Sequence, residues 1–343
     1  MNYKFDVAVI LINYNSSVHS VDCIQSIIER TGTGINYQII VVDNCSKEEE
    51  YEYLEKFCRN LGFKHLTLLR SRINTGFGGG NMYGMQHADS RYLVFLNNDT
   101  LLKNDCLSIL YQYMNTHPHV GITGAQSFKP DGEFIISFDH FASLKREILG
   151  RSFLELLNKR RYPRRKHKYD SPLEVDFVSG SFMMIQASDF YQTGGFDTNL
   201  FLFYEETDLG KRIKAAGKST MLVPEAEYVH IHGASTPHSI QTKKELKISL
   251  LYVIRKHSGY TPYLILLTYL RIRYLFSCIF KPKYRELFSL FMRGAPLSAS
   301  MKLKQKVNPN YPRHNMNVKP HLIFIRSSKP IIKEPDQSHS AEH

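Results

Sequence analysis

The sequence predicts an α/β protein with a mostly parallel central sheet flanked by helices, followed by a helical C-terminal extension. Short continuous runs rich in Val and Ile recur along the first third of the chain, and helix-like segments separate them. Such runs are typical of strands buried on both faces, and their regular alternation with helices favours parallel pairing. From about residue 240 the pattern becomes helical, which predicts the extension.

The expected elements alternate along the first part of the chain. Strands are expected at 7–12, 38–42, 65–69, 92–96 and 120–123, and helices at 18–30, 47–60, 79–89 and 104–117. A second apolar stretch at 175–185 and an acidic helix start near 205 extend the same domain. We therefore expect one main domain over 1–239, with halves 1–125 and 126–239, then a helical region over 240–300 and a basic, Pro-rich tail over 301–343.

Composition limits the partners and the compartment. The 44 Lys and Arg residues exceed the 32 Asp and Glu residues, and the net charge of +12 indicates a nucleic acid, an anionic membrane or a phosphorylated ligand. The five cysteines include no CxxC pair, so we expect neither a disulfide framework nor a zinc site, and a cytoplasmic location. The first residues run directly into an apolar strand, which we interpret as buried rather than as a signal peptide.

Polar residues follow four of the expected strands. In a parallel sheet, ligands bind beyond the carboxyl ends of the strands, so these residues are expected to share one crevice. They are Asn13-Tyr14-Asn15, Asp43-Asn44, the segment from Asn74 to Asn81, and Asn97-Asn98-Asp99.

Glycines gather at positions 76, 78, 79 and 80, after the third expected strand. Their spacing does not match G-x-G-x-x-G and no Gly-Lys-Ser/Thr follows, which disfavours a Rossmann dehydrogenase and a P-loop. The remaining interpretations are a close approach of Gly76 and Gly78 to a ligand, or a tight turn.

Asp99 and two histidines are candidate metal ligands. A carboxylate directly after a buried strand suits a hard divalent cation, although Asn-Asn-Asp-Thr is also a good helix start. His230 and His232 share one face if they lie on a strand, and either is a metal ligand or an ordinary polar residue.

A second acidic cluster contains Glu205, Glu206 and Asp208. Acidic side chains in the first turn of a helix are stabilised by the helix dipole, which is the purely structural interpretation. The functional interpretation is that one carboxylate acts as a general base on an attacking hydroxyl group.

Taken in this order, the clusters resemble the inverting glycosyltransferases of family 2, which have the GT-A fold, and within them the bacterial rhamnosyltransferase-like branch. The resemblance covers approximately residues 5–257. The strand-end motifs match the nucleotide-binding half of the catalytic domain. The acceptor half is matched by Gly180-Ser181, Gly194-Gly195-Phe196-Asp197, Glu205-Glu206-Thr207-Asp208-Leu209 and His230 to Ser235.

The resemblance implies a nucleotide-sugar co-substrate and a divalent metal, Mg²⁺ or Mn²⁺. Asp43 corresponds to the group that hydrogen-bonds the base or ribose. Asp99 and His230 correspond to metal contacts, with His232 less favoured. This sequence has Asn97 and Asn98 within the family's Asp-x-Asp motif, so one carboxylate anchors the metal there. The residues implied around the nucleotide are Asn13, Tyr14, Asn15, Asp43, Asn74, Gly76, Gly78, Asn97 and Asn98.

The catalytic base implied by the resemblance is Glu206, which stands where the family has the Asp of a Glu-Asp pair. Asp208 is the rival, and Glu205 and Asp208 otherwise orient the acceptor or support the site. The implied mechanism is a single in-line displacement, in which metal and nearby donors stabilise the departing nucleoside diphosphate.

The implied substrates belong to bacterial surface-glycan synthesis, such as O-antigen or capsule. The branch favours dTDP-rhamnose as donor, with a UDP-hexose next, and a lipid-linked or polysaccharide acceptor at the inner face of the cell membrane. Two other classes of protein are alternatives. A nucleotidylyltransferase would show a basic glycine-rich loop after the first strand, where Asn13-Tyr14-Asn15 stands. A non-catalytic module for anionic glycan or nucleic acid is suggested by the charge, but no nucleic-acid motif is present and no nucleic-acid partner is expected.

Two further segments have alternative interpretations. The basic stretch over 145–168 is either a solvated, partly mobile loop or a surface that holds a phosphorylated or membrane-bound acceptor. The apolar segment 260–280 contains Arg271 and Arg273, each costing ~2.5–3.5 kcal/mol at a bilayer centre, which favours a helix in the membrane interface over a spanning one. The alternative is packing on the catalytic domain or on a second subunit, as in a homodimer.

Overall fold

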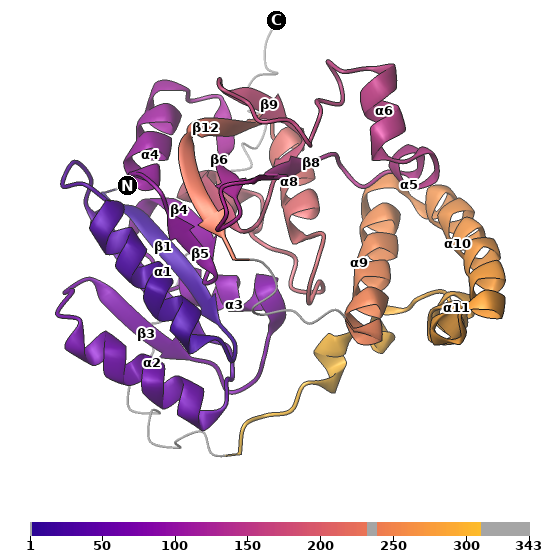
Figure 1. Ribbon diagram of the computed structural model, residues 1–343, viewed down its shortest axis with the longest axis horizontal. Coiled ribbons are helices and arrows are strands. Elements are labelled where there is room, and N and C mark those ends of the chain that lie inside the picture. The colour runs from indigo at the N-terminus through magenta and orange to yellow at the C-terminus, as the bar shows by residue number, and fades with distance from the viewer. Residues whose placement is uncertain (1, 232–238, 310–343) are drawn as a thin grey trace, which may run out of the picture. The chain divides into compact units, whose positions relative to one another are not determined.

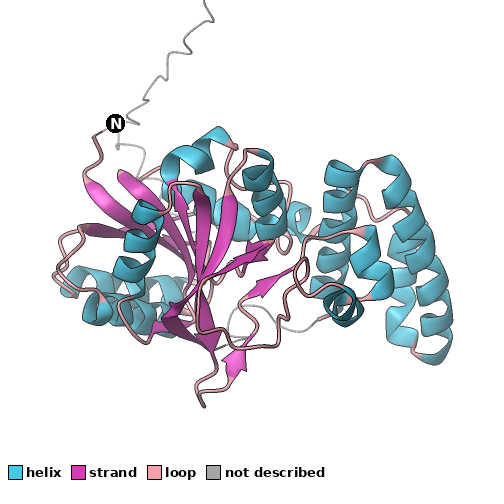
Figure 2. Ribbon diagram, turned by 90° about the horizontal axis from the view of Figure 1, so that it is seen from above, coloured by secondary structure: helices cyan, strands magenta, loops and turns pink. Residues whose placement is uncertain are grey.

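A central sheet runs through the computed structural model of the protein, with helices on both of its faces (Figures 1 and 2). The structure describes residues 2–231 and 239–309. The strand order is β3-β2-β1-β4-β11-β6-β12-β5, with β7 beside β6 and β9 beside β12. The strands are β1 (Phe5–Asn13), β2 (Tyr37–Asp43), β3 (Leu66–Arg70), β4 (Ser90–Asn97), β5 (Thr100–Leu102), β6 (Val120–Phe128), β7 (Phe134–Ile135), β9 (Leu173–Val175), β11 (Phe182–Gln186) and β12 (Ser219–His230), and β8 (Phe138–Asp139) and β10 (Phe177–Val178) form a separate pair.

The first four strands in this order pair in parallel, as predicted. β1 pairs with β2 and β4, and β2 pairs with β3. The register places Asn13 opposite Asp43 and Ile12 opposite Asn97. The predicted convergence of polar strand ends at one edge of the sheet is therefore present.

The second half of the sheet is mixed. β11 runs antiparallel between β4 and β6, whereas β12 is parallel to β6. The pairing of β12 shifts between Val223 and Glu227, around Pro224, because proline has no N–H to donate to a neighbouring strand. After this irregularity β12 continues to His230, which brings that residue to the same edge of the sheet as Asn97.

Helices bury one apolar core on each face of the sheet. One core contains side chains of α1 (Ser17–Arg30), α2 (Glu48–Asn60) and α4 (Cys106–Thr116). The other contains side chains of α7 (Ala187–Gln192) and α8 (Glu205–Ala215), with α3 (Gly76–Met85) packed against it. The helix predicted near 205 from its acidic start is α8.

The glycines of α3 let this helix lie close to the sheet. The helix begins at Gly76, three residues before the expected start. A Cβ atom at Gly84 would lie 2.7 Å from Ile10 Cγ2 and 3.0 Å from Val42 Cγ2, and one at Gly80 would lie 2.9 Å from Ile12 Cδ1. Of the glycines at 76, 78, 79 and 80, Gly80 is explained by this packing, whereas a Cβ atom at Gly76 would meet Phe201 and one at Gly79 would meet Thr75.

The C-terminal extension is helical, as predicted. Its helices α9 (Ile240–Ser258), α10 (Tyr260–Phe280) and α11 (Arg285–Met292) share a third apolar core, and α10 also packs on α5 (Leu144–Leu149). The short helices η1 (Pro282–Tyr284), η2 (Leu297–Ala299) and η3 (Met301–Lys304) flank α11. Met1–Asn308 forms one compact unit, and the division at 239 and 240 stays a prediction.

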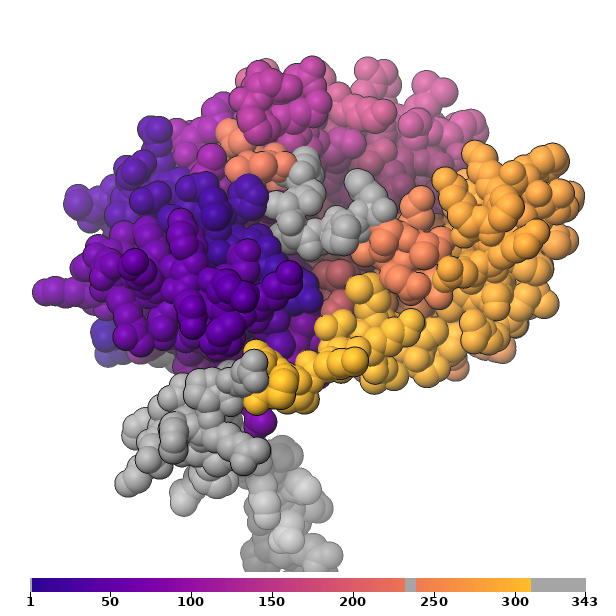
Figure 3. Space-filling model, turned by 60° about the horizontal axis from the view of Figure 1, so that its bottom comes forward, coloured from indigo at the N-terminus to yellow at the C-terminus, as the bar shows by residue number. Residues whose placement is uncertain are grey.

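The segment after α11 crosses to the N-terminal half, where Figure 3 shows it in yellow beside purple residues. The backbone N–H of Asn308 donates to Arg72 O at 2.8 Å. From residue 310 the predicted tail lies outside the described residues, as do His232 and residues 233–235 of the motif that begins at His230.

Replacing Gly84 with valine tests the packing of α3. We expect Gly84→Val to lower the free energy of unfolding by about 1–3 kcal/mol, because its side chain would overpack against Ile10 and Val42. Urea denaturation measures the change. Gly34→Val is the control, since nothing lies within 4 Å of a Cβ atom there. Equal stability of the two variants would contradict the packing role.

Candidate active site

Two adjoining cavities lie at the carboxyl edge of the sheet and share Phe77, Asn97 and Leu202. The strand-end cavity, of about 330 Å³, lies against the ends of β1 and β4, the start of α3, the start of α9 and η3. The Glu206 cavity, of about 310 Å³, lies against the start of α8, the Ser179–Ser181 turn and the end of β12. Polar residues of the strand-end cavity are Tyr14, Asn44, Asn74, Asn97, Asn98, Ser239, Thr242 and Gln305.

Asn44 organises the turn that leads into α3. Its Nδ2 donates to Asn74 Oδ1 at 3.1 Å and to Gly76 O at 3.0 Å, and its Oδ1 accepts from Thr75 N at 3.0 Å. Gly76 has a φ of +75°, and a Cβ atom there would collide with Phe201 O. Our predicted site residues included Asn74 and Gly76 but not Asn44, although its position directly after β2 was a usable signal.

Asp43 lies beneath the strand-end cavity, with its side chain fully buried. It accepts from Asn13 Nδ2 at 2.9 Å and from Ser46 N at 3.2 Å, and Arg70 Nε lies 3.6 Å away. Burial raises the pKa of Asp43 above its ordinary value despite these partners. The Asp43 side chain therefore links the end of β1 to the loop that follows β2, and its contact with a base or ribose stays a prediction.

The predicted nucleotide contacts near Asp43 differ in their exposure to solvent. Tyr14 is exposed and lines the cavity, whereas Asn15, with a φ of 50°, faces α2 and accepts from Lys47 N at 2.8 Å. Asn98 is buried and donates to the hydroxyls of Ser16 and Ser20, each at 2.8 Å. Of the predicted nucleotide contacts, Asn13, Asn15, Asp43 and Gly78 are not among the residues that line either cavity.

The two predicted metal ligands are neighbours in space. His230 Nε2 and Asp99 Oδ1 lie 3.1 Å apart, and both side chains are buried. A carboxylate oxygen and an imidazole nitrogen fit a divalent cation that takes its remaining ligands from a diphosphate and water. Within 2–231 and 239–309, no group of three or more His, Cys, Asp or Glu side chains could hold a metal ion.

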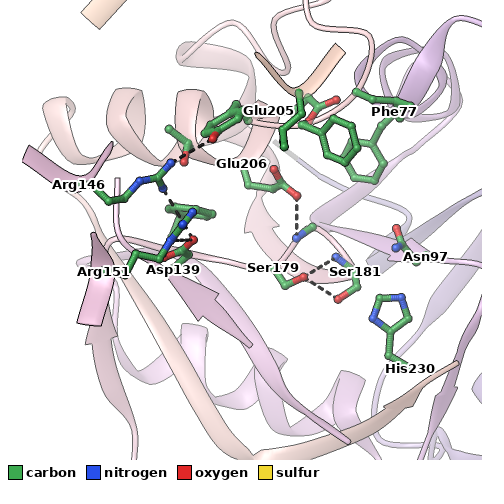
Figure 4. Close-up of a pocket in the computed structure, with 17 residues that line it drawn as sticks. Phe77, Asn97, Asp139, Arg146, Arg151, Ser179, Ser181, Glu205, Glu206 and His230 are labelled. Atoms are coloured by element: carbon green, nitrogen blue, oxygen red, sulfur yellow. Dashed lines mark hydrogen bonds and ion pairs between the residues drawn. The ribbon is translucent and has the colours of Figure 1, made fainter. Parts of the chain in front are cut away.

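Glu206 projects into its cavity between the Ser179–Ser181 turn and the start of α8, as Figure 4 shows. Its Oε1 accepts from Gly180 N at 3.1 Å, and a Cβ atom at residue 180 would collide with this carboxylate. Burial raises the pKa of Glu206. A carboxylate with a raised pKa is a stronger base, which suits removal of a proton from a hydroxyl group.

Glu205 is more deeply buried than Glu206. Among the described residues its Oε1 has no hydrogen-bond partner. Burial, and then the negative charge of Glu206, raise the pKa of Glu205 well above its ordinary value. The two neighbouring carboxyls therefore favour a state in which they share one negative charge.

Asp208 does not line either cavity, and the side chains of Arg212, Lys256 and His257 surround its buried carboxylate. Arg212 Nη2, Lys256 Nζ and His257 Nε2 each lie 2.7 Å from it. Although burial opposes ionisation, the hydrogen bond with His257 and the interactions with Arg212 and Lys256 hold the pKa of Asp208 well below its usual range. Such a carboxylate is a poor base, so the geometry favours Glu206 over Asp208.

The basic stretch over 145–168 is folded, and the interpretation as a solvated loop is wrong for its best-packed arginines. It contains α5 and α6 (Arg151–Leu157). Arg146 is buried, contacts Glu147 at 2.7 Å and donates to His140 O at 2.6 Å. Arg151 Nε lies 2.8 Å from Asp139. Each of these two arginines is therefore paired with an acidic side chain. Both arginines line the Glu206 cavity.

The chain is similar in sequence to known glycosyltransferases. A sequence profile described as Glycosyl transferase family 2 matches residues 8–194. Rhamnosyltransferase WbbL of Escherichia coli (strain K12) is 28% identical over 232 residues, which cover 64% of this chain and 83% of the relative. N-acetylglucosaminyl-diphospho-decaprenol L-rhamnosyltransferase of Mycobacterium tuberculosis (strain CDC 1551 / Oshkosh) is 27% identical, over 49% of this chain and 57% of the relative.

A solved structure supports the fold. The structure of GalNAc-T7 with UDP, GalNAc and Mn²⁺ superposes with a TM-score of 0.57 at 15% identity. The match covers 85% of this chain and 56% of that one. At this identity the likeness concerns the fold alone.

Neutralising Asp208 tests its role in stability. Asp208→Asn should lower the free energy of unfolding at pH 7 by about 3 kcal/mol, because Arg212 and Lys256 lose their buried anionic partner and His257 loses a hydrogen bond to a carboxylate. Since the pKa is depressed in the folded state, this contribution is complete above the unfolded pKa and is lost as pH falls below about 4. Urea denaturation at pH 7, 5 and 3.5 measures the difference between wild type and variant.

The exposed Asp170 provides the control, and Asp170→Asn should match wild type at every pH. A pH-independent loss in Asp208→Asn would contradict the ion-pair explanation.

Proposed function

The chain belongs to glycosyltransferase family 2, within its rhamnosyltransferase-like branch and with the GT-A fold, and we propose that it transfers a sugar from a nucleotide-diphospho-sugar to an acceptor hydroxyl with inversion at the anomeric carbon. The observation that carries this proposal is the placement of Glu206 in a cavity adjoining the strand-end cavity. A base on one side and a nucleotide on the other match the two ends of an in-line displacement.

The strand-end cavity is the proposed donor site. Its lining offers the Tyr14 ring and several side-chain amides, which suit a nucleoside. Asn97 and Phe77 border both cavities, so we place the transferred sugar beside them. We propose dTDP-rhamnose as the donor, on the support of two relatives that are named as rhamnosyltransferases.

In the proposed mechanism, Glu206 accepts the proton of the acceptor hydroxyl as that oxygen attacks the anomeric carbon. The hydrogen bond from Gly180 N holds the carboxylate in place, and burial keeps the pKa of Glu206 raised. Asp99 and His230 would hold Mg²⁺ or Mn²⁺, which neutralises charge on the departing diphosphate when bound. The bond to the nucleotide breaks as the new glycosidic bond forms, without a covalent sugar-enzyme intermediate.

We also propose that α10 places the enzyme on the cytoplasmic face of a membrane. By length and composition, α10 is the one described helix that could cross a membrane. It buries one side against α9 and α11, and the Arg271 guanidinium donates to Phe291 O at 3.0 Å. The opposite side is an exposed apolar stripe formed by Leu264, Ile265, Ile272, Leu275, Phe276 and Ile279.

Charge favours an anionic bilayer over a second copy of the chain as the partner of this stripe. From residue 260 to 285 the sequence contains five basic residues and no acid. Next to the stripe, α5 and α6 expose further apolar side chains, among them Leu149, Phe153 and Leu156. Apolar surface bordered by an excess of basic residues is typical of a helix lying in the membrane interface.

Replacing Glu206 with glutamine tests the base. Glu206→Gln should lower kcat by about 10²–10⁴-fold, because the amide cannot accept the proton. Calorimetry should show that the affinity for the nucleotide is unchanged, since residue 206 lies in the Glu206 cavity and not in the strand-end cavity. The control Glu225→Gln removes an exposed carboxylate and should keep full activity. Retained turnover in Glu206→Gln would contradict its assignment as the base.

Replacing Asp99 with alanine tests the metal site. Asp99→Ala should weaken metal-dependent nucleotide binding about tenfold or more, because the single carboxylate beside His230 is lost. Titration with and without EDTA measures the metal-dependent part. Asp22→Ala, at an exposed position, serves as the control. An unchanged response to EDTA would remove Asp99 from the metal site.

Polar substitutions in the stripe test membrane contact. Ile272→Gln with Phe276→Gln should weaken binding to phosphatidylglycerol and phosphatidylcholine vesicles about tenfold or more in a flotation assay, because two apolar side chains are no longer buried. The control is Val18→Gln with Tyr53→Gln, two exposed apolar residues on other helices. Unchanged vesicle binding together with loss of a dimer in light scattering would instead assign the stripe to a second copy.

A further inference from the structure

The segment after α11 forms one wall of the strand-end cavity. Met301, at the start of η3, and Gln305, directly after η3, line this cavity together with residues that follow β1, β2 and β3. Both side chains are partly buried, whereas Leu303 between them is 67% exposed. The segment therefore presents Met301 and Gln305 to the cavity and Leu303 to solvent.

Hydrogen bonds hold this segment at both of its ends. Glu245 of α9 accepts from Ser300 Oγ and from Met301 N, each at 2.7 Å, and both Glu245 and Ser300 are buried. At the other end, the backbone N–H of Asn308 donates to Arg72 O. Residues 300–308 thus run from the helical extension to the N-terminal half on fixed contacts (Figure 3).

The side-chain amide of Gln305 is oriented by a contact within the segment. Its Nε2 donates to Met301 O at 3.0 Å. A carbonyl oxygen can only accept, so this contact fixes which end of the amide is the nitrogen. Among the described residues the Oε1 atom of Gln305 has no hydrogen-bond partner. That atom is left as an acceptor for a molecule in the cavity.

Asn74 supplies a donor to the same cavity. Its Oδ1 accepts from Asn44 Nδ2 at 3.1 Å and from Gly76 N at 2.9 Å, so the orientation of this amide is fixed as well. Its Nδ2 has no hydrogen-bond partner in the part of the chain that the structure describes. The strand-end cavity therefore offers an oriented amide acceptor, an oriented amide donor and the exposed Tyr14 ring.

These groups match the imide edge of a pyrimidine base. Thymine and uracil have an N3–H donor between two carbonyl oxygens, whereas cytosine and adenine have no proton on the corresponding ring nitrogen. Guanine adds an exocyclic amino group, which needs a second acceptor. Bases bound outside a duplex are recognised in this way, by hydrogen bonds to their edge and by stacking on an aromatic ring.

We propose that Gln305 recognises the base of the donor, with its Oε1 accepting from N3–H of thymine while Asn74 Nδ2 donates to a neighbouring carbonyl oxygen. This inference rests on the proposed glycosyl transfer and deepens it. It assigns base recognition to a segment that lies outside residues 8–194, the part of the chain that matches the family. Gln305 acts in binding and takes no part in proton transfer, so its loss should raise KM for the donor more than it changes kcat.

Calorimetry with dTDP and N3-methyl-dTDP tests this contact. Each nucleotide is titrated into the full chain with Mn²⁺ at saturating concentration. The wild type should bind N3-methyl-dTDP about tenfold or more weakly than dTDP, because the methylated base cannot donate from N3. Gln305→Ala should weaken the binding of dTDP about tenfold and bind the two nucleotides with similar affinity. The control Leu303→Ala changes an exposed residue of the same segment and should keep both wild-type affinities.

Each outcome has a distinct meaning. An unchanged preference for dTDP in Gln305→Ala, or equal binding of the two nucleotides by the wild type, would overturn the proposal and leave the donor site in place. Equal weakening of both nucleotides in Gln305→Ala would also overturn it, by showing that the residue only shapes the cavity. If the wild type bound no dTDP at all, the proposed function itself would be contradicted, and base recognition with it. Failure of the donor site and failure of base recognition are therefore distinguishable.

Discussion

The buried carboxylate of Asp208 links the catalytic part of the fold to the helical extension. It lies in the first turn of α8, two residues after Glu206, and bonds to Lys256 and His257 of α9. Burying such a charge costs several kcal/mol unless cations and hydrogen bonds compensate it, and here they come from two helices. Removing this link would therefore free both the start of α8 and the end of α9.

The same network fixes the Gly194 to Asp197 turn. Arg212 bonds to Asp208 and also donates to Gly195 O at 2.6 Å, and Lys256 bonds to Asp197 at 2.7 Å. The Gly194 to Asp197 turn and the first turn of α8 are thus held by one set of charges. Their common role is to hold the backbone that leads into Glu205 and Glu206.

That backbone is strained immediately before α8. Phe203 and Tyr204 both have left-handed φ values, 73° and 70°, which cost on the order of 1 kcal/mol or more each for residues with side chains. Contacts on both sides hold the turn: Arg146 Nη2 donates to the Tyr204 hydroxyl at 3.2 Å, and Ser249 Oγ donates to Leu202 O at 2.8 Å. The strain is compatible with an active site in which Glu206 is aimed at a fixed point.

Much of this arrangement was predictable from the sequence, because periodicity and strand-end polarity are local signals. The four parallel strands, the helical extension and the meeting of Asp99 with His230 follow from such signals and from the family resemblance. Tertiary contacts decided the rest. The insertion of β11 between β4 and β6 depends on long-range pairing. The burial of Arg146 depends on its ion pair with Glu147, which the net charge of the chain does not reveal. The position of Asn44 after β2 placed it at this edge of the sheet, but its hydrogen bonds to Asn74 and Gly76 depend on how the fold brings the two segments together.

The central claim is that the strand-end cavity binds a nucleoside diphosphate together with a divalent metal. Calorimetric titration of the wild-type chain with dTDP, UDP and GDP, each with and without Mn²⁺ or Mg²⁺, tests it most directly. The account predicts that dTDP binds, that the metal strengthens its binding, and that the other two bind more weakly. Preferential binding of UDP would retain the transferase and change the donor, whereas no binding of any nucleotide with either metal would contradict the account.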